Sequence, residues 1–191
     1  MTYYTFTHSL DPRAAEIVDL PDKVEKYYFL SDGIPVASYL PPSTELSLYS
    51  GAGDMLTDFV GNPDRVLDVS QRARDLMLQQ GLSEDLVEYL PFILVDKRGR
   101  RLQEQYFIAN PLLRVPCLER SLSKYRLNSD DPNDIGRIHV LHLVEDLPQE
   151  ARLFRVAEFT RLMVIRSDLL ETLQQAGLTG LHVQPVGTRL P

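Results

Sequence analysis

Two segments of the chain repeat almost the same pattern of apolar and polar positions. Residues 69–82 read VSQRARDLMLQQGL, and residues 165–178 read IRSDLLETLQQAGL. In the first segment Ala73, Leu76 and Met77 share one face of a helix, and leucines dominate that face in the second. Both segments end in Gly-Leu, which is typical of a helix that stops at a residue tolerant of positive φ. The pattern therefore predicts two short amphipathic helices.

Strands are predicted on either side of each helix. Ser70 follows an apolar strand segment, and its hydroxyl can accept a backbone N–H at the start of the first helix. Two β-rich segments flank the charged turn DKRGRR and predict a hairpin. We expect strands at residues 66–69, 87–95, 105–111, 138–144, 153–157, 162–165 and 181–186.

The first third of the chain has a less regular pattern. Residues 11–20 predict a short helix, residues 26–30 a strand, and residues 55–60 a turn and a half of helix. Farther on, the polar residues 118–132 are expected to form a loop.

These elements predict an α+β fold class, with largely antiparallel mixed sheets and two main packed helices. The repeated strand–helix–strand unit predicts an internal duplication with both helices over a shared sheet; convergence of two unrelated amphipathic helices is the alternative. We expect residues 64–191 to form the α+β core and residues 1–63 to be an irregular region packed on it. The whole is expected to be one compact unit.

The composition narrows the classes of function. A formal net charge of −7 disfavours binding to nucleic acid, whose phosphates attract Lys and Arg, and suits either a basic partner or simple solubility. Cys117 is the single cysteine, which excludes an intramolecular disulfide and suits a reducing compartment. No secretory signal or membrane-spanning apolar run is recognisable, so the expected location is the cytoplasm.

Candidate catalytic and metal-binding patterns are weak. Cys117 has no local catalytic motif, although a histidine such as His139 or His142 could approach it in space. These two histidines lie at an odd offset in an expected strand and so face opposite sides of the sheet. The loop SDDPNDIG at residues 129–136 resembles a calcium loop, but its twelfth position is His142 instead of Glu. We therefore predict no enzyme activity, no cofactor and no metal.

Several segments in the centre and second half of the chain resemble a known family. The resemblance covers residues 64 to the C-terminus, whereas the N-terminal third matches only loosely. Small landmarks are Leu153-Phe154-Arg155 and Thr179-Gly180-Leu181. The matching segments are RVLDVSQRARDLML, EYLPFILVDKRG, YFIANPL, VPCLERSLS, ARLFRVAE and LMVIRSDLLETLQQAGLTGLHVQPV.

These segments resemble the myxobacterial-type immunity proteins of bacterial polymorphic toxin systems, a family formerly described as a domain of unknown function. One departure is Pro116 before the Cys117-Leu118 pair, where the family pattern leads us to expect an acidic residue; Glu119 does follow the pair. This departure favours packing over function for that segment.

The resemblance implies function by binding. Such a protein would occlude a cognate toxin or secreted effector domain in the cytoplasm, without catalysis or cofactor. Two alternatives remain open: an effector-binding adaptor or chaperone, and a small enzyme that uses Cys117. The toxin would be basic if it cuts nucleic acid, as a nuclease does, and a negative surface would then steer it. From charge and expected exposure, the predicted partner-binding residues are Asp54, Asp58, Asp130, Asp131 and Asp134.

Overall fold

The described part of the chain folds into two five-stranded sheets, a separate two-stranded sheet and three helices. The computed structural model describes residues 1–7, 9, 11–18, 29–63 and 66–191, and all structural statements concern these residues. Sheet one has the strand order β12 (Val183–Pro185), β1 (Tyr3–Phe6), β11 (Met163–Arg166), β10 (Leu153–Val156) and β7 (Arg114–Val115). Sheet two has the order β2 (Glu45–Ser47), β5 (Val87–Val95), β6 (Tyr106–Pro111), β4 (Leu67–Ser70) and β3 (Phe59–Val60). The remaining elements are β8 (Lys124–Leu127), β9 (Ile135–Val140), α1 (Phe29–Asp32), α2 (Gln71–Gln79) and α3 (Ser167–Gln175).

The predicted α+β class is confirmed, and most strand pairs are antiparallel. Only β2 with β5 and β7 with β10 run parallel among the paired strands described. Both predicted amphipathic helices are present. The Ser70 hydroxyl accepts from the Ala73 N–H at 3.1 Å, as its position before the helix predicted. Gly81 and Gly177, at φ 82° and 71°, follow the ends of α2 and α3.

The sequence repeat has a counterpart in the topology. In the first half a β3–β4 hairpin leads through α2 to β5, and in the second half a β10–β11 hairpin leads through α3 to β12. In each half one antiparallel strand is inserted between the strands that the helix connects: β6 in sheet two and β1 in sheet one. The two units therefore build separate sheets, and the prediction that they share one sheet is wrong.

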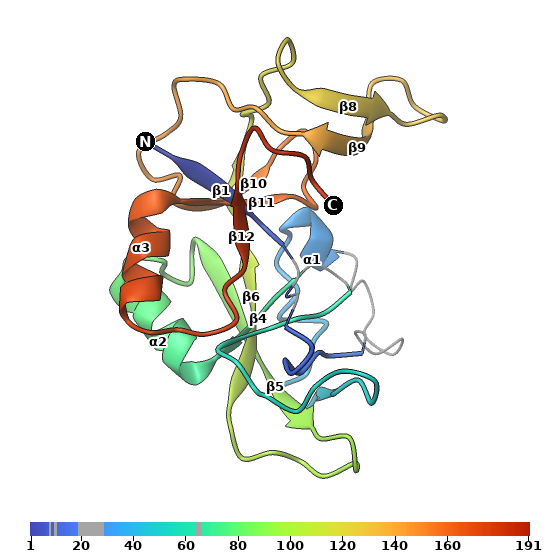
Figure 1. Ribbon diagram of the computed structural model, residues 1–191, viewed down its shortest axis with the longest axis vertical. Coiled ribbons are helices and arrows are strands. Elements are labelled where there is room, and N and C mark those ends of the chain that lie inside the picture. Colours follow the sequence, from blue (N-terminus) through green and yellow to red (C-terminus); the bar gives the residue numbers. More distant parts are fainter. Residues whose placement is uncertain (8, 10, 19–28, 64–65) are drawn as a thin grey trace.

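The two helices join the halves instead of covering one sheet. They lie side by side on the same side of the molecule (Figure 1) and contact each other. Ala73 and Met77 of α2 belong to the same buried apolar cluster as Leu169 and Leu173 of α3. A crossover helix packs on one face of its own sheet, and any apolar surface of the helix that is still exposed needs a second partner. For α2 this second partner is α3, and for α3 it is α2.

A buried arginine connects the two sheets at a point away from α2 and α3. Arg155 of β10 is 1% exposed, and burial lowers the pKa of its guanidinium to about 10. Its Nε donates to the Pro111 carbonyl at 3.0 Å, and its Nη2 donates to Asn110 Oδ1 at 3.3 Å, both at the end of β6. Its Nη1 donates to the carbonyls of Thr160 at 2.9 Å and Ser31 at 3.3 Å. Arg155 thus connects sheet one to sheet two and to α1.

A second joint lies between β3 and the loop that follows α3. The Phe59 N–H donates to the Thr179 carbonyl at 3.0 Å. Gly180 adopts φ 78°, and a Cβ added there would lie 2.2 Å from the Phe59 carbonyl oxygen and 2.5 Å from Thr57 Oγ1. Only a residue without a side chain fits this approach of the two backbones.

Three expected elements differ from the structure. Residues 11–18 form isolated bridges, such as Ala14 with Met55, where a helix was predicted, and residues 19–20 lie outside the described residues. Residues 55–60 end in strand β3, because Phe59 and Val60 pair with β4. Residues 118–132 contain β8, whose exposed side chains gave the polar pattern of a loop.

Smaller differences concern two further strands. Of the strand expected at residues 26–30, residues 26–28 lie outside the described residues, and Phe29 and Leu30 begin helix α1. Strand β9 begins at Ile135 and ends at Val140, earlier than the expected residues 138–144.

Candidate functional site

The five predicted acidic residues do not form one surface. Asp54 has a side chain that is 91% exposed and pairs with Lys97, whose Nζ lies 2.9 Å from Asp54 Oδ1. Lys97 belongs to the turn between β5 and β6, whereas Asp130, Asp131 and Asp134 belong to the loop between β8 and β9. These two regions occupy opposite ends of the long axis in Figure 1.

Asp58 serves an internal role in the structure. Its side chain is only 12% exposed, and its Oδ1 accepts from the Ser70 hydroxyl at 2.7 Å. Its Oδ2 accepts from the N–H and hydroxyl of Thr179 at 2.9 and 3.0 Å. Arg72 lies 3.5 Å from the same carboxylate and donates to the Ala176 carbonyl. Asp58 therefore ties the start of α2 to the loop after α3.

The β8–β9 loop presents the remaining three carboxylates to solvent. Asp130, Asp131 and Asp134 are all exposed. The contacts of the loop are local: Asp131 accepts from the Asn133 N–H at 2.9 Å, and Asn128 donates to Asp134 at 3.3 Å. The loop therefore provides three accessible carboxylates close together, whereas Asp54 is exposed but lies apart from them.

The buried cysteine offers little reactivity. Cys117 is fully buried in the core beneath sheet one. Burial, and then the nearby Glu158 carboxylate, raise the pKa of the thiol to about 12, which keeps it in the protonated, weakly nucleophilic form. Glu158 also accepts from the backbone N–H groups of Cys117 and Leu118 at 3.3 and 3.4 Å. Across the described residues, no cluster of three His, Cys, Asp or Glu side chains could hold a metal ion.

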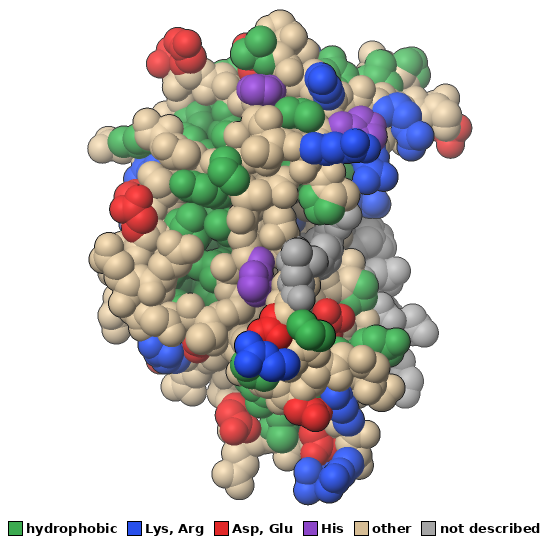
Figure 2. Space-filling model, viewed as in Figure 1, with side chains coloured by type: hydrophobic (Ala, Val, Ile, Leu, Met, Phe, Trp, Pro, Cys, Tyr) green, Lys and Arg blue, Asp and Glu red, His purple; other side chains and the backbone are tan. Residues whose placement is uncertain are grey.

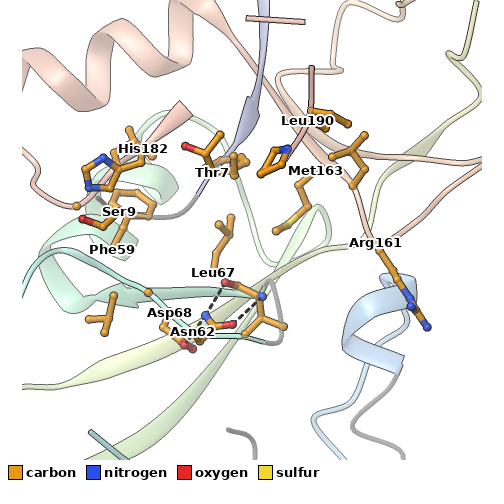
Figure 3. A pocket seen from close by; sticks show the side chains of 18 of the residues that line it. Thr7, Ser9, Phe59, Asn62, Leu67, Asp68, Arg161, Met163, His182 and Leu190 are labelled. Atoms are coloured by element: carbon orange, nitrogen blue, oxygen red, sulfur yellow. Dashed lines mark hydrogen bonds between the residues drawn. The ribbon is translucent and has the colours of Figure 1, made fainter. Parts of the chain in front are cut away.

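A small cavity lies where the two halves meet (Figure 3), and it was not among the sites expected from the sequence. Its volume is about 130 Å³, and Phe59, Leu67 and Met163 provide apolar walls. Asn62 donates to Asp68 at 2.9 Å on one side, and His182 lies on another. Pockets for drug-sized ligands usually hold about 300–1,000 Å³, so this cavity suits at most one large side chain or a few waters. Its lining comes from many distant segments, which is why no local motif predicts it.

A comparison with protein-family models matches residues 3–188 to an immunity protein family, Imm11. The chain belongs to this immunity family. No curated protein matches the chain. Within the described residues, no helix has both the length and the apolar character to cross a membrane.

The family match reaches farther toward the N-terminus than the motifs that carried the resemblance. Those motifs begin near residue 64, whereas the immunity-family match begins at residue 3. The topology gives a physical reason, because β1 lies between β11 and β12 and β2 pairs with β5. Both sheets of the immunity fold therefore contain a strand from the first third of the chain.

Proposed function

We propose that this chain binds a cognate toxin or effector domain and neutralises it by steric occlusion, without catalysis or a cofactor. The observation that carries the proposal is the immunity-family match over nearly the whole chain. The raised pKa of the buried Cys117 thiol and the small volume of the cavity are consistent with binding as the mode of action. A standard protein interface of about 1,600 Å² would be sufficient for such an inhibitor. The proposed place of action is the cytoplasm.

The net charge of −7 favours a partner with a basic surface, as a nuclease toxin would have. Asp130, Asp131 and Asp134 are exposed carboxylates on one protruding loop, so they are the candidates for steering that partner during encounter. We do not include Asp58 in this role, because its oxygens accept bonds within the protein. Asp54 lies apart and pairs with Lys97.

Charge reversal of the loop, with Asp130, Asp131 and Asp134 all changed to Lys, is expected to slow toxin association about tenfold at low salt. The dependence of the association rate on ionic strength should become flatter, because screening acts on these long-range attractions. Stopped-flow association of the purified domains measures both quantities. Asp54→Lys, at the other end of the molecule, carries the same change in charge as one of these substitutions and should leave the rate nearly unchanged. Unchanged association kinetics in the triple variant would mean that the loop does not steer the toxin.

Co-expression with the toxin encoded beside this chain tests the proposed function itself. Cells that produce both proteins should survive, whereas cells that produce the toxin alone should not. An adaptor or chaperone would bind the toxin domain without protecting the cells. Binding and cell survival, measured together, therefore distinguish an inhibitor from an adaptor or chaperone.

A further inference from the structure

The β8–β9 sheet forms an arm with two regions of opposite charge. The loop at its tip carries the three exposed aspartates described above, whereas exposed cations occupy the strands and the segment beside them. Lys and Arg side chains, with a histidine among them, gather at this end of the molecule in Figure 2. The exposed cations are Arg120, Lys124, Arg126, Arg137 and Arg189.

Two of these arginines face each other across the sheet. Arg126 of β8 stands directly opposite Arg137 of β9, and both are exposed. Like charges in directly opposite positions destabilise an antiparallel pair. Arg137 donates to the Pro191 carbonyl oxygen at 3.1 Å, but among the described residues no Asp or Glu carboxylate lies within 4.0 Å of Lys124, Arg126 or Arg137. Stability of the arm does not explain this arrangement.

The arm is anchored on one side and open on the other. Ile135 and Ile138 of β9 are each 3% exposed and pack into the core beneath sheet one. The outer side of β9 receives the C-terminal segment, since Leu190 N–H donates to the His139 carbonyl at 2.8 Å. Strand β8 pairs with β9 alone among the described strands, so its other edge carries unpaired backbone groups.

Exposed apolar side chains flank this open edge. Leu122, just before β8, is 60% exposed, and Leu127, at its end, is 42% exposed. An extended chain added to an edge obtains affinity from backbone hydrogen bonds and specificity from its alternate side chains. The edge of β8 offers apolar contacts at its ends and a positive charge at Arg126 between them.

We propose that β8 accepts an extended acidic segment of the cognate toxin as an added strand, with a carboxylate beside Arg126. This inference rests on the proposed function. A carboxylate next to Arg126 would neutralise the charge of this side chain, which has no Asp or Glu within 4.0 Å among the described residues. The acidic tip and the basic strands together would favour a partner that carries both signs in the matching order, and would disfavour partners of one sign.

Other occupants fit the edge less well. A second copy of this chain would bring its own β8, with Lys124 and Arg126, against the same cations. Nucleic acid would meet the carboxylates of Asp130, Asp131 and Asp134 beside the basic strands, on a chain of net charge −7. Charged side chains also protect exposed edges from self-pairing. That protective role is satisfied by a charge of either sign, whereas the proposed docking needs a positive one.

The sign of the charge therefore provides the test. The probe is the toxin domain encoded beside this chain, purified in a form whose own activity has been removed. Titration calorimetry is expected to show binding at least ~100-fold weaker for Arg126→Glu than for the unchanged chain. Arg98→Glu, at an exposed position on the β5–β6 turn, is the matched control and should bind within about threefold of the unchanged chain. Far-ultraviolet circular dichroism verifies that both variants are folded.

Hydrogen exchange supplies a second, independent readout. The backbone amides of β8 should become protected when the toxin domain binds, because an added strand pairs with them. Equal affinity of Arg126→Glu and the unchanged chain, or a complex without protection at β8, would overturn the inference and leave the proposed function intact. Absence of toxin binding by the unchanged chain would contradict both. Self-association or DNA binding that protects β8 and is lost in Arg126→Glu would assign the edge to that partner and overturn the proposal.

Discussion

Arg155→Met is expected to lower the free energy of unfolding by about 3 kcal/mol or more. The substitution leaves the Pro111 and Thr160 carbonyls and the Asn110 amide oxygen without the donor that they share. Methionine fills much of the same volume, so the loss reports chiefly the missing hydrogen bonds between the two sheets. Relief of the desolvation of the charge offsets part of this loss. Urea-induced unfolding, followed by circular dichroism, measures it.

Two further variants serve as comparisons for the loss of stability in Arg155→Met. Arg98→Met removes an exposed arginine at the β5–β6 turn and should change stability by less than about 0.5 kcal/mol. Arg155→Lys should be intermediate, because an ammonium group is a point donor and cannot reach all the acceptors of the planar guanidinium. A loss below about 1 kcal/mol for Arg155→Met would contradict the assignment of Arg155 as the joint between the sheets.

Gly180→Ala is expected to destabilise the protein by about 3 kcal/mol or more, and so to shift the urea midpoint strongly. A residue with a Cβ is strained at the φ of 78° that the backbone adopts here. The added Cβ would also lie 2.2 Å from the Phe59 carbonyl oxygen. Relief requires the loop after α3 to move away from β3. That movement also disturbs the hydrogen bonds between Thr179 and Asp58 that close the same joint.

Gly81→Ala is the matched control for this prediction. Gly81 has a similar φ of 82°, but an added Cβ there would meet nothing within 4 Å. It should therefore cost only the backbone strain of about 1–2 kcal/mol. The difference between the two variants measures the contact between the halves. Equal losses would mean that the joint at Gly180 contributes nothing beyond backbone conformation.

The parts of the fold that local sequence could predict are those with local causes. Helices α2 and α3 follow from their apolar faces, the Ser70 cap and the terminating glycines, and the β5–β6 hairpin follows from the turn between two β-rich segments. The position of β1 between β11 and β12 has no local signal, since it depends on pairing with residues more than 150 positions away. For the same reason the pattern could not show that the two helical units build separate sheets.

Two landmarks of the family resemblance acquire a physical meaning in the structure. Arg155, in Leu153-Phe154-Arg155, connects the two sheets, and Gly180, in Thr179-Gly180-Leu181, permits the close approach of the loop after α3 to β3. Both landmarks lie at contacts between the two halves. They therefore describe the scaffold of the immunity fold more than its recognition surface.

The candidate recognition residues were only partly accessible to sequence reasoning. Charge and expected exposure selected Asp58, but only the three-dimensional structure shows that its carboxylate accepts from Ser70 and from Thr179, which is 121 positions away from it. The same residue type at Asp130 stays exposed because its loop connects two strands of a protruding arm. The open edge of β8 was hidden from sequence reasoning, because an exposed polar strand and a polar loop have similar composition.

Neutralisation by binding is measured by the survival of cells that produce the proposed cognate toxin together with this chain. The toxin is placed under an inducible promoter, and this chain is supplied unchanged, as Cys117→Ala, or not at all. The unchanged chain and Cys117→Ala are expected to protect the cells equally, because a buried thiol whose pKa is raised to about 12 takes no part in inhibition. Cell death in the presence of the unchanged chain, or loss of protection in a folded Cys117→Ala variant, would contradict neutralisation by binding alone.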